Sequence, residues 1–128
     1  MKTSKKGLPP GTIVYTGDQK VEKTIINVFL YSGERIEVVR EVQLDDLDHL
    51  LKREDCITWV DIRGLHDVEL LQRIGQEGDI HPLILEDIAD VHQRPKYESL
   101  ENGAFLVLQA MYFNKHNLFK SEQVSMYV

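Results

Sequence analysis

The chain has 128 residues, of which 42% are apolar and 28% charged, with a net charge of −6. This composition is ordinary for one globular domain and argues against disorder along the whole chain. The negative charge disfavours general nucleic-acid binding, which needs cationic groups to neutralise phosphates. The single cysteine, Cys56, excludes an internal disulfide.

Membrane and export signals are not visible in the sequence. A membrane-spanning helix needs about 20 mostly apolar residues, and the longest apolar stretch, at 104–113, is interrupted by Gln109. The basic start is followed by a glycine- and proline-rich segment and not by the apolar core of a secretory signal. We therefore expect a cytoplasmic chain.

The first third of the chain predicts an arm, a short strand and a hairpin. Residues 1–11 contain two consecutive prolines and are expected to form an extended arm. A short strand is predicted at 12–16. Residues 24–31 and 34–42 are rich in β-branched residues, and Gly33 between them favours the tight turn of a β-hairpin.

The middle of the chain alternates helix and strand patterns. In the second hairpin strand the apolar residues alternate with glutamates, which predicts one buried and one solvated face. The inward positions would then be Ile36, Val38 and Val42. Leucines at the helical period and an acidic first turn predict a helix at 44–52. A strand follows at 57–62, with Trp59 expected to anchor the core.

Two further helices and three strands complete the predicted fold. The helices are expected at 66–76, which Gly78 would end, and at 82–91, where proline suits the first position. The last strands are predicted at 97–101, 104–113 and 119–128, and the middle one is apolar on both alternating sets, as in a strand covered on both faces. This order predicts the α/β class, as a layered α/β/α sandwich with a mixed parallel and antiparallel sheet. The chain ends within an expected strand, which suggests a piece of a longer protein.

The predicted helix at 82–91 carries the densest polar cluster. Its apolar arc consists of Ile84, Leu85, Ile88, Ala89 and Val91. The opposite arc gathers Glu86, Asp87 and Asp90, with Leu83 among them. Carboxylate oxygens are the ligands that Mg²⁺ prefers, but one helix face cannot complete an octahedral shell, so another segment or subunit would have to contribute. An acidic face that is only solvated is the competing interpretation.

Catalytic schemes find less support. His81 and His92 flank the cluster but lack the i, i+4 spacing of the helical zinc motif His-Glu-x-x-His, and His81 precedes a proline, as a capping residue would. The sequence contains no Gly-x-Ser-x-Gly, no phosphate-binding glycine-rich loop and no Gly-x-Gly-x-x-Gly. We therefore do not expect an enzyme.

Several motifs resemble the CorA family of magnesium and cobalt transporters. The arm motif Lys-Lys-Gly-Leu-Pro-Pro-Gly-Thr-Ile-Val-Tyr-Thr-Gly stands at 5–17, and Thr-Trp-Val-Asp-Ile-Arg-Gly-Leu stands at 58–65. The most specific motif is His-Pro-Leu-Ile-Leu-Glu-Asp-Ile at 81–88, followed by His-Gln-Arg-Pro-Lys at 92–96. Glu-Gln-Val-Ser at 122–125 lies near the end. The resemblance thus covers nearly the whole chain, in the order of the family.

The resemblance implies a regulatory role at the cytoplasmic face of the cell membrane. Family members are homopentamers whose carboxy-terminal membrane helices and Gly-Met-Asn signature are absent from this sequence. Residues 1–11 would be the arm and 12–128 the truncated regulatory domain. Mg²⁺, with Co²⁺ as an alternative, would bind between identical subunits at Asp87, Glu86 and the main-chain carbonyl of Leu8. Because half of each site would come from elsewhere, binding by the isolated chain is expected to be weak.

Three alternatives stay open at this point. A zinc-transporting branch shares the broad fold. A metal-dependent hydrolase could use His81, Glu86, Asp87 and His92, and it predicts that these side chains converge. A metal-free interaction module would use the acidic face only for solubility. Whether Asp90 takes part in metal binding is also open.

Overall fold

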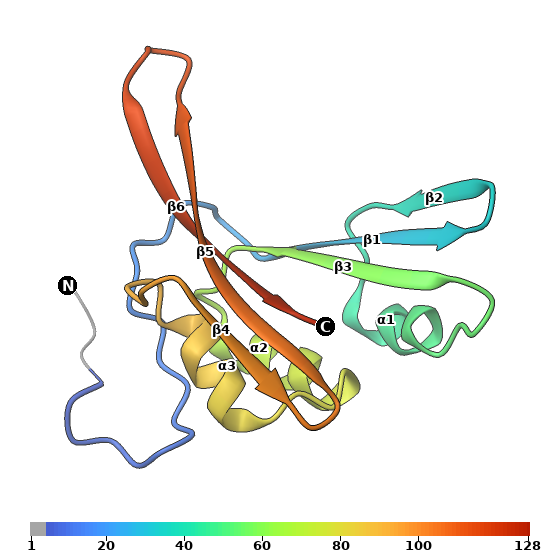
Figure 1. The fold of residues 1–128 in the computed structure, drawn as a ribbon, viewed down its shortest axis with the longest axis horizontal. Coiled ribbons are helices and arrows are strands. Elements are labelled where there is room, and N and C mark those ends of the chain that lie inside the picture. The colour runs from blue at the N-terminus through green and yellow to red at the C-terminus, as the bar shows by residue number, and fades with distance from the viewer. Residues whose placement is uncertain (1–4) are drawn as a thin grey trace.

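A computed structural model describes residues 5–128, so residues 1–4 of the predicted arm lie outside the described part. The strands form two three-stranded sheets, in the orders β2-β1-β3 and β4-β5-β6 (Figure 1). The elements in chain order are β1 (Ile25–Ser32), β2 (Arg35–Val39), α1 (Leu44–Leu51), β3 (Ile57–Arg63), α2 (Val68–Glu77), α3 (Pro82–Ala89), β4 (Lys96–Leu100), β5 (Gly103–Phe113) and β6 (Phe119–Tyr127). No helix within 5–128 is long and apolar enough to cross a membrane.

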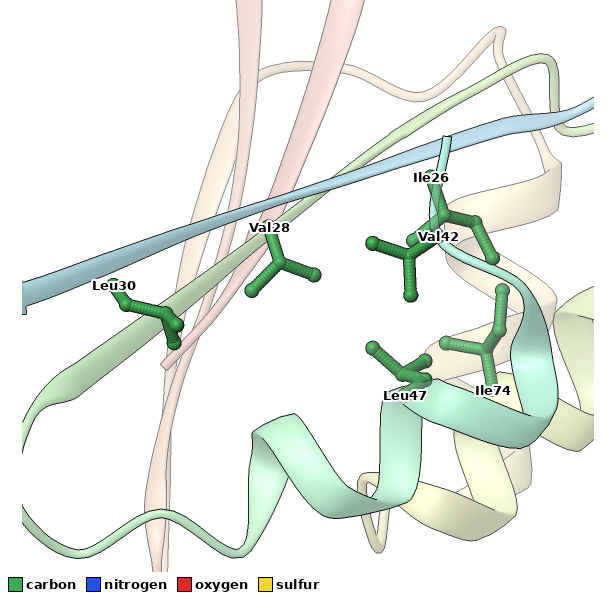
Figure 2. Packing of buried hydrophobic residues seen from close by; sticks show 6 residues of the cluster. All are labelled: Ile26, Val28, Leu30, Val42, Leu47 and Ile74. Carbon is green, nitrogen blue, oxygen red and sulfur yellow. The ribbon is translucent and has the colours of Figure 1, made fainter. Parts of the chain in front are cut away.

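The first sheet is built on the predicted hairpin, which is confirmed. β1 pairs with β2 up to the turn at Ser32 and Arg35, and its other edge pairs with β3. Alternate residues of β1 point toward α1, and Figure 2 shows Val28 facing Leu47 of that helix. Both side chains are fully buried, so this contact lies at the centre of the first core. Ile74 of α2 belongs to the same cluster, so α2 also packs against the core of the first sheet.

The second sheet packs on α3. Ile84 of this helix contacts Phe105 and Val107, which are fully buried on β5. The opposite side of α3 packs on α2 in a separate small cluster that includes Leu71 and Leu85. Helix α3 is therefore held between a sheet and a neighbouring helix, and its remaining surface is left for polar residues.

The predicted α/β class is confirmed, but the mixed sheet is not. Within residues 5–128 every strand pairing is antiparallel, and the strands divide into two sheets. The short turns β1–β2, β4–β5 and β5–β6 allow only antiparallel neighbours, whereas parallel pairing needs a long crossover. The helices lie on one side of each sheet (Figure 1), so the layered α/β/α sandwich is not confirmed either.

Three orientation predictions are wrong for one reason. Val38 and Trp59 lie on either side of Phe29 in the register, on the face of the sheet away from α1. Trp59 is 51% exposed and Ile36 is 67% exposed, so neither anchors the core. Glu37 lies on the helix side instead, where Arg53 pairs with it at 3.2 Å. The residues of β2 do alternate between two faces, but the face covered by α1 is the one that carries Glu37 and not the one that carries Ile36 and Val38.

Two further predictions are wrong, one on the covering of β5 and one on a strand at 12–16. β5 is the central strand, as expected, but only one of its faces is covered, because Leu108 on the other face is 45% exposed. Residues 12–16 form no strand. They run along α3 instead, with Ile13 buried against the helix and the amide of Thr16 bonded to the carbonyl of Ala89. This segment has a helix and not a strand edge beside it, so no ladder can form.

Candidate metal site on helix α3

The acidic residues of helix α3 lie at the surface because of where the helix begins and which of its residues are buried. Pro82 occupies the start of the helix, and Nδ1 of His81 accepts a hydrogen bond from the amide of Leu83 at 3.1 Å. His81 therefore caps the helix, as predicted. With Ile84, Leu85 and Ala89 buried, the helical period turns Glu86 and Asp87 outward, and their side chains are 24% and 27% exposed.

The amino-terminal arm crosses this acidic face. The amide of Gly11 donates a 2.7 Å hydrogen bond to the Glu86 carboxylate, and Nζ of Lys5 donates to the main-chain carbonyl of Glu86 at 2.8 Å. Lys5 also lies 3.6 Å from a carboxylate oxygen of Glu86 and 3.5 Å from one of Asp90. The arm is thus fastened to the helix by charge and by main-chain contacts.

A surface depression of about 480 Å³ lies between the arm and the helix. It is lined by Leu8, Pro10, Leu83, Ile84, Glu86, Asp87 and Glu98. The structure therefore brings the three residues predicted for the metal site, Leu8, Glu86 and Asp87, to the wall of one concavity. Glu98 of β4 is a fourth polar contributor that sequence reasoning did not single out.

Lysine side chains neutralise the carboxylates of this depression. Nζ of Lys96 lies 2.7 Å from Asp87 and 2.6 Å from Glu98, and it stands 5.4 Å from the centre of the Phe105 ring. Partial burial lowers the pKa of Lys96, but its hydrogen bonds to the two carboxylates outweigh this and the net pKa is raised. Lys96 therefore stays charged and holds both acidic groups.

Asp90 is engaged in a different way. Its side chain accepts hydrogen bonds from the Thr16 hydroxyl at 2.8 Å, from the His92 amide at 3.3 Å and from Gln93 at 3.2 Å. Burial raises the pKa of Asp90, but these bonds and the charge of Lys5 outweigh it, so the pKa lies below its usual value. Through Thr16 and Lys5 these contacts tie the segment before β1 to the carboxyl end of α3, so Asp90 has a structural task.

Within residues 5–128, no group of three or more His, Cys, Asp and Glu side chains could hold a metal ion. The described residues alone therefore do not offer the oxygen shell that Mg²⁺ prefers. The convergence required by the hydrolase alternative is not found among the described residues either. His81 caps α3, and Nε2 of His92 stands 3.3 Å from the main-chain oxygen of Thr16.

Sequence reasoning missed the cationic half of this site. In the sequence Lys96 is only a basic residue after Pro95. It lies nine positions from Asp87, a spacing that no helix or strand period brings together across the break after α3. Lys5 is 81 positions from Glu86. Only the crossing of the arm and the start of β4 bring these lysines to the helix.

Comparison with known proteins confirms the predicted resemblance. No family model matches the chain. It is 47% identical, over an alignment of 128 residues that covers 97% of its length, to the cobalt/magnesium transport protein CorA of Thermotoga maritima. The chain spans 35% of the length of that protein.

Proposed function

We propose, from its similarity to CorA over nearly the whole chain, that this protein is the Mg²⁺-sensing regulatory part of a transporter for Mg²⁺ and Co²⁺. In this proposal it stands on the cytoplasmic face of the membrane as one of five identical subunits. Mg²⁺ bound between neighbouring copies, by Asp87, Glu86 and the carbonyl of Leu8, holds the transporter closed. The chain itself performs no reaction.

The observation that carries the proposal is the depression between the arm and α3. Its wall contains three carboxylates, those of Glu86, Asp87 and Glu98, and two residues of the arm. Mg²⁺ binds through one or two carboxylates and keeps several waters. A second copy that presents its own oxygens to the depression would supply the remaining ligands.

The gating step follows from linkage between ion binding and conformation. An ion that binds the closed assembly more tightly than the open one shifts the population toward the closed form. When Mg²⁺ is scarce, carboxylates of adjacent copies repel each other and the assembly loosens. The Mg²⁺ concentration inside the cell would in this way set the fraction of closed transporters.

The proposal also includes the layered α/β/α sandwich with a mixed sheet as the fold of the longer protein. Large apolar side chains remain exposed on the sheet surfaces away from the helices, and such patches mark sites that pack against something. They include Ile36, Val38, Ile57, Trp59, Leu108 and Val124. A further layer of helices on these faces would complete the sandwich.

A chimaera tests the function. The matching stretch of the Thermotoga maritima protein is replaced by this chain, and Mg²⁺ uptake is measured while the internal Mg²⁺ concentration is varied. Asp87→Ala should raise the internal concentration that gives half-inhibition by about tenfold, since loss of one charged ligand group is worth roughly 1.5 kcal/mol. Asp46→Ala removes an exposed aspartate of α1 and serves as the matched control.

Two outcomes would contradict parts of the proposal. An unchanged inhibition curve for Asp87→Ala removes this residue from the sensor. A chimaera that assembles and transports but ignores internal Mg²⁺ removes the sensing role from the whole chain. The reading frame beyond Val128 gives an independent check, because the proposal requires two apolar segments and a Gly-Met-Asn signature there.

A further inference from the structure

We propose that Lys96 is a built-in competitor for the divalent cation, and that it occupies Asp87 until Mg²⁺ displaces it. This inference rests on the proposed Mg²⁺ site at Asp87 and deepens it. It assigns to Lys96 the role of setting the ion concentration at which the site responds.

The geometry places the ammonium group where a cation would bind. Nζ of Lys96 lies 2.7 Å from Oδ2 of Asp87 and 2.6 Å from Oε1 of Glu98, so one positive charge bridges two carboxylates of the depression. The other oxygen of Asp87, Oδ1, accepts a hydrogen bond from Gln93 at 3.3 Å. Both oxygens of Asp87 therefore already have donors before any ion arrives.

The lysine is held in this position by its surroundings. Its side chain is only 28% exposed, and its ammonium faces the ring of Phe105 on the neighbouring strand. Lys96 is paired with Val107 across the β4–β5 ladder, so its backbone is fixed as well. A side chain held in this way loses little conformational freedom in forming the ion pair, unlike a lysine on a free surface.

Displacement of the Lys96 ammonium would free the carboxylates of both Asp87 and Glu98. A Mg²⁺ ion that binds Asp87 is repelled by the lysine charge unless Nζ moves away. When Nζ moves, Glu98 loses its partner as well and becomes available at the wall of the same depression. The ion must therefore overcome an existing pair, which raises the concentration needed for binding.

The test is an NMR titration of the isotopically labelled chain with MgCl₂, at ionic strength held constant with NaCl. The shifts of the Asp87 amide give the dissociation constant, and the ¹⁵Nζ signal of Lys96 reports the position of the ammonium. In the wild type the Lys96 signal should move with the same midpoint as the Asp87 amide. Lys96→Met, which keeps most of the unbranched side chain but not its charge, should bind Mg²⁺ about fivefold more tightly.

Two variants separate charge from packing. Lys96→Arg keeps the charge and should bind Mg²⁺ within about twofold of the wild type. Lys52→Met removes a lysine that pairs with Asp48 at 2.6 Å on α1, and it should leave Mg²⁺ binding at Asp87 unchanged. The amide signals of β4 and β5 show whether each variant keeps the fold.

The outcomes distinguish the inference from the function on which it rests. If the wild type binds Mg²⁺ at Asp87 and Lys96→Met binds it equally or more weakly, the competitor role is wrong and the Mg²⁺ site stands. If Lys96→Arg tightens binding as much as Lys96→Met, the effect comes from packing and the inference is overturned. The titration extends to MgCl₂ concentrations at which the weak binding expected of the isolated chain would appear. If Asp87 responds in neither the wild type nor Lys96→Met over that range, the proposed Mg²⁺ site itself is wrong.

Discussion

The amide of Gly11 donates a hydrogen bond of 2.7 Å to the carboxylate of Glu86, although the two residues are 75 positions apart. This bond fastens the arm across the acidic face of α3, beside the depression that Asp87 also lines. One residue of the proposed metal site therefore has a structural task as well. Its two tasks can be separated by measuring stability and ion binding independently.

Glu86→Ala should lower the free energy of unfolding by about 1–2 kcal/mol, because the Gly11 amide loses a charged acceptor. Urea unfolding measures this loss, and amide exchange at Gly11 should become faster. Glu86→Gln keeps an acceptor oxygen and should lose less than half as much. Unchanged exchange at Gly11 in Glu86→Ala would show that the bond does not hold the arm.

Thr16→Val should also lower the free energy of unfolding, by about 1–2 kcal/mol. The Thr16 hydroxyl is buried, donates to Asp90 at 2.8 Å and accepts from the amide of Val91 at 3.2 Å. Valine has the same shape but removes one donor to Asp90 and leaves the amide of Val91 without its acceptor. Thr16→Ser keeps the hydroxyl and should recover most of the loss in urea unfolding. Equal losses for the two variants would assign the effect to the methyl group.

The low pKa of Asp90 predicts a specific acid sensitivity. Its folded-state pKa lies below the unfolded value, so the unfolded chain takes up the proton more readily. The stabilisation is therefore complete above about pH 4 and is lost as the pH falls through the folded-state pKa. Asp90→Asn should flatten the fall of the unfolding free energy below about pH 4.

Urea unfolding at a series of pH values measures the acid sensitivity of the wild type and Asp90→Asn. Asp79→Asn is the matched control, because it makes the same change at an exposed position whose positive φ of 51° suits asparagine. If Asp90→Asn loses stability with acid as steeply as the wild type, the ionised Asp90 carboxylate does not stabilise the fold.

Gly75→Ala should destabilise the contact between α2 and α3. Alanine would gain about 1 kcal/mol of helix propensity, but a Cβ at this buried position would overlap the side chain of Leu85, which is itself buried. Overpacking costs about 1–3 kcal/mol, so a net loss of thermal stability is expected. Adding Leu85→Val should restore part of it. A higher melting temperature for Gly75→Ala alone would show that Leu85 can move aside.

The sequence by itself determined the type and order of nearly all elements. The hairpin around Gly33, the three helices and the last three strands follow from local patterns, because turn chemistry and periodicity act within a few neighbouring residues. The outward position of Glu86 and Asp87 was predictable for the same reason. The helical period places them opposite the apolar arc of α3.

The tertiary structure alone decided which faces are covered and which distant charges meet. Periodicity tells which residues share a face but not which face another element covers, so Trp59 and Ile36 were assigned to the wrong side. The division into two antiparallel sheets, the course of 12–16 along α3 and the pairing of Lys96 with Asp87 depend on contacts between segments far apart in the chain. No local pattern encodes these contacts, because they arise only when the arm, α3 and β4 pack together.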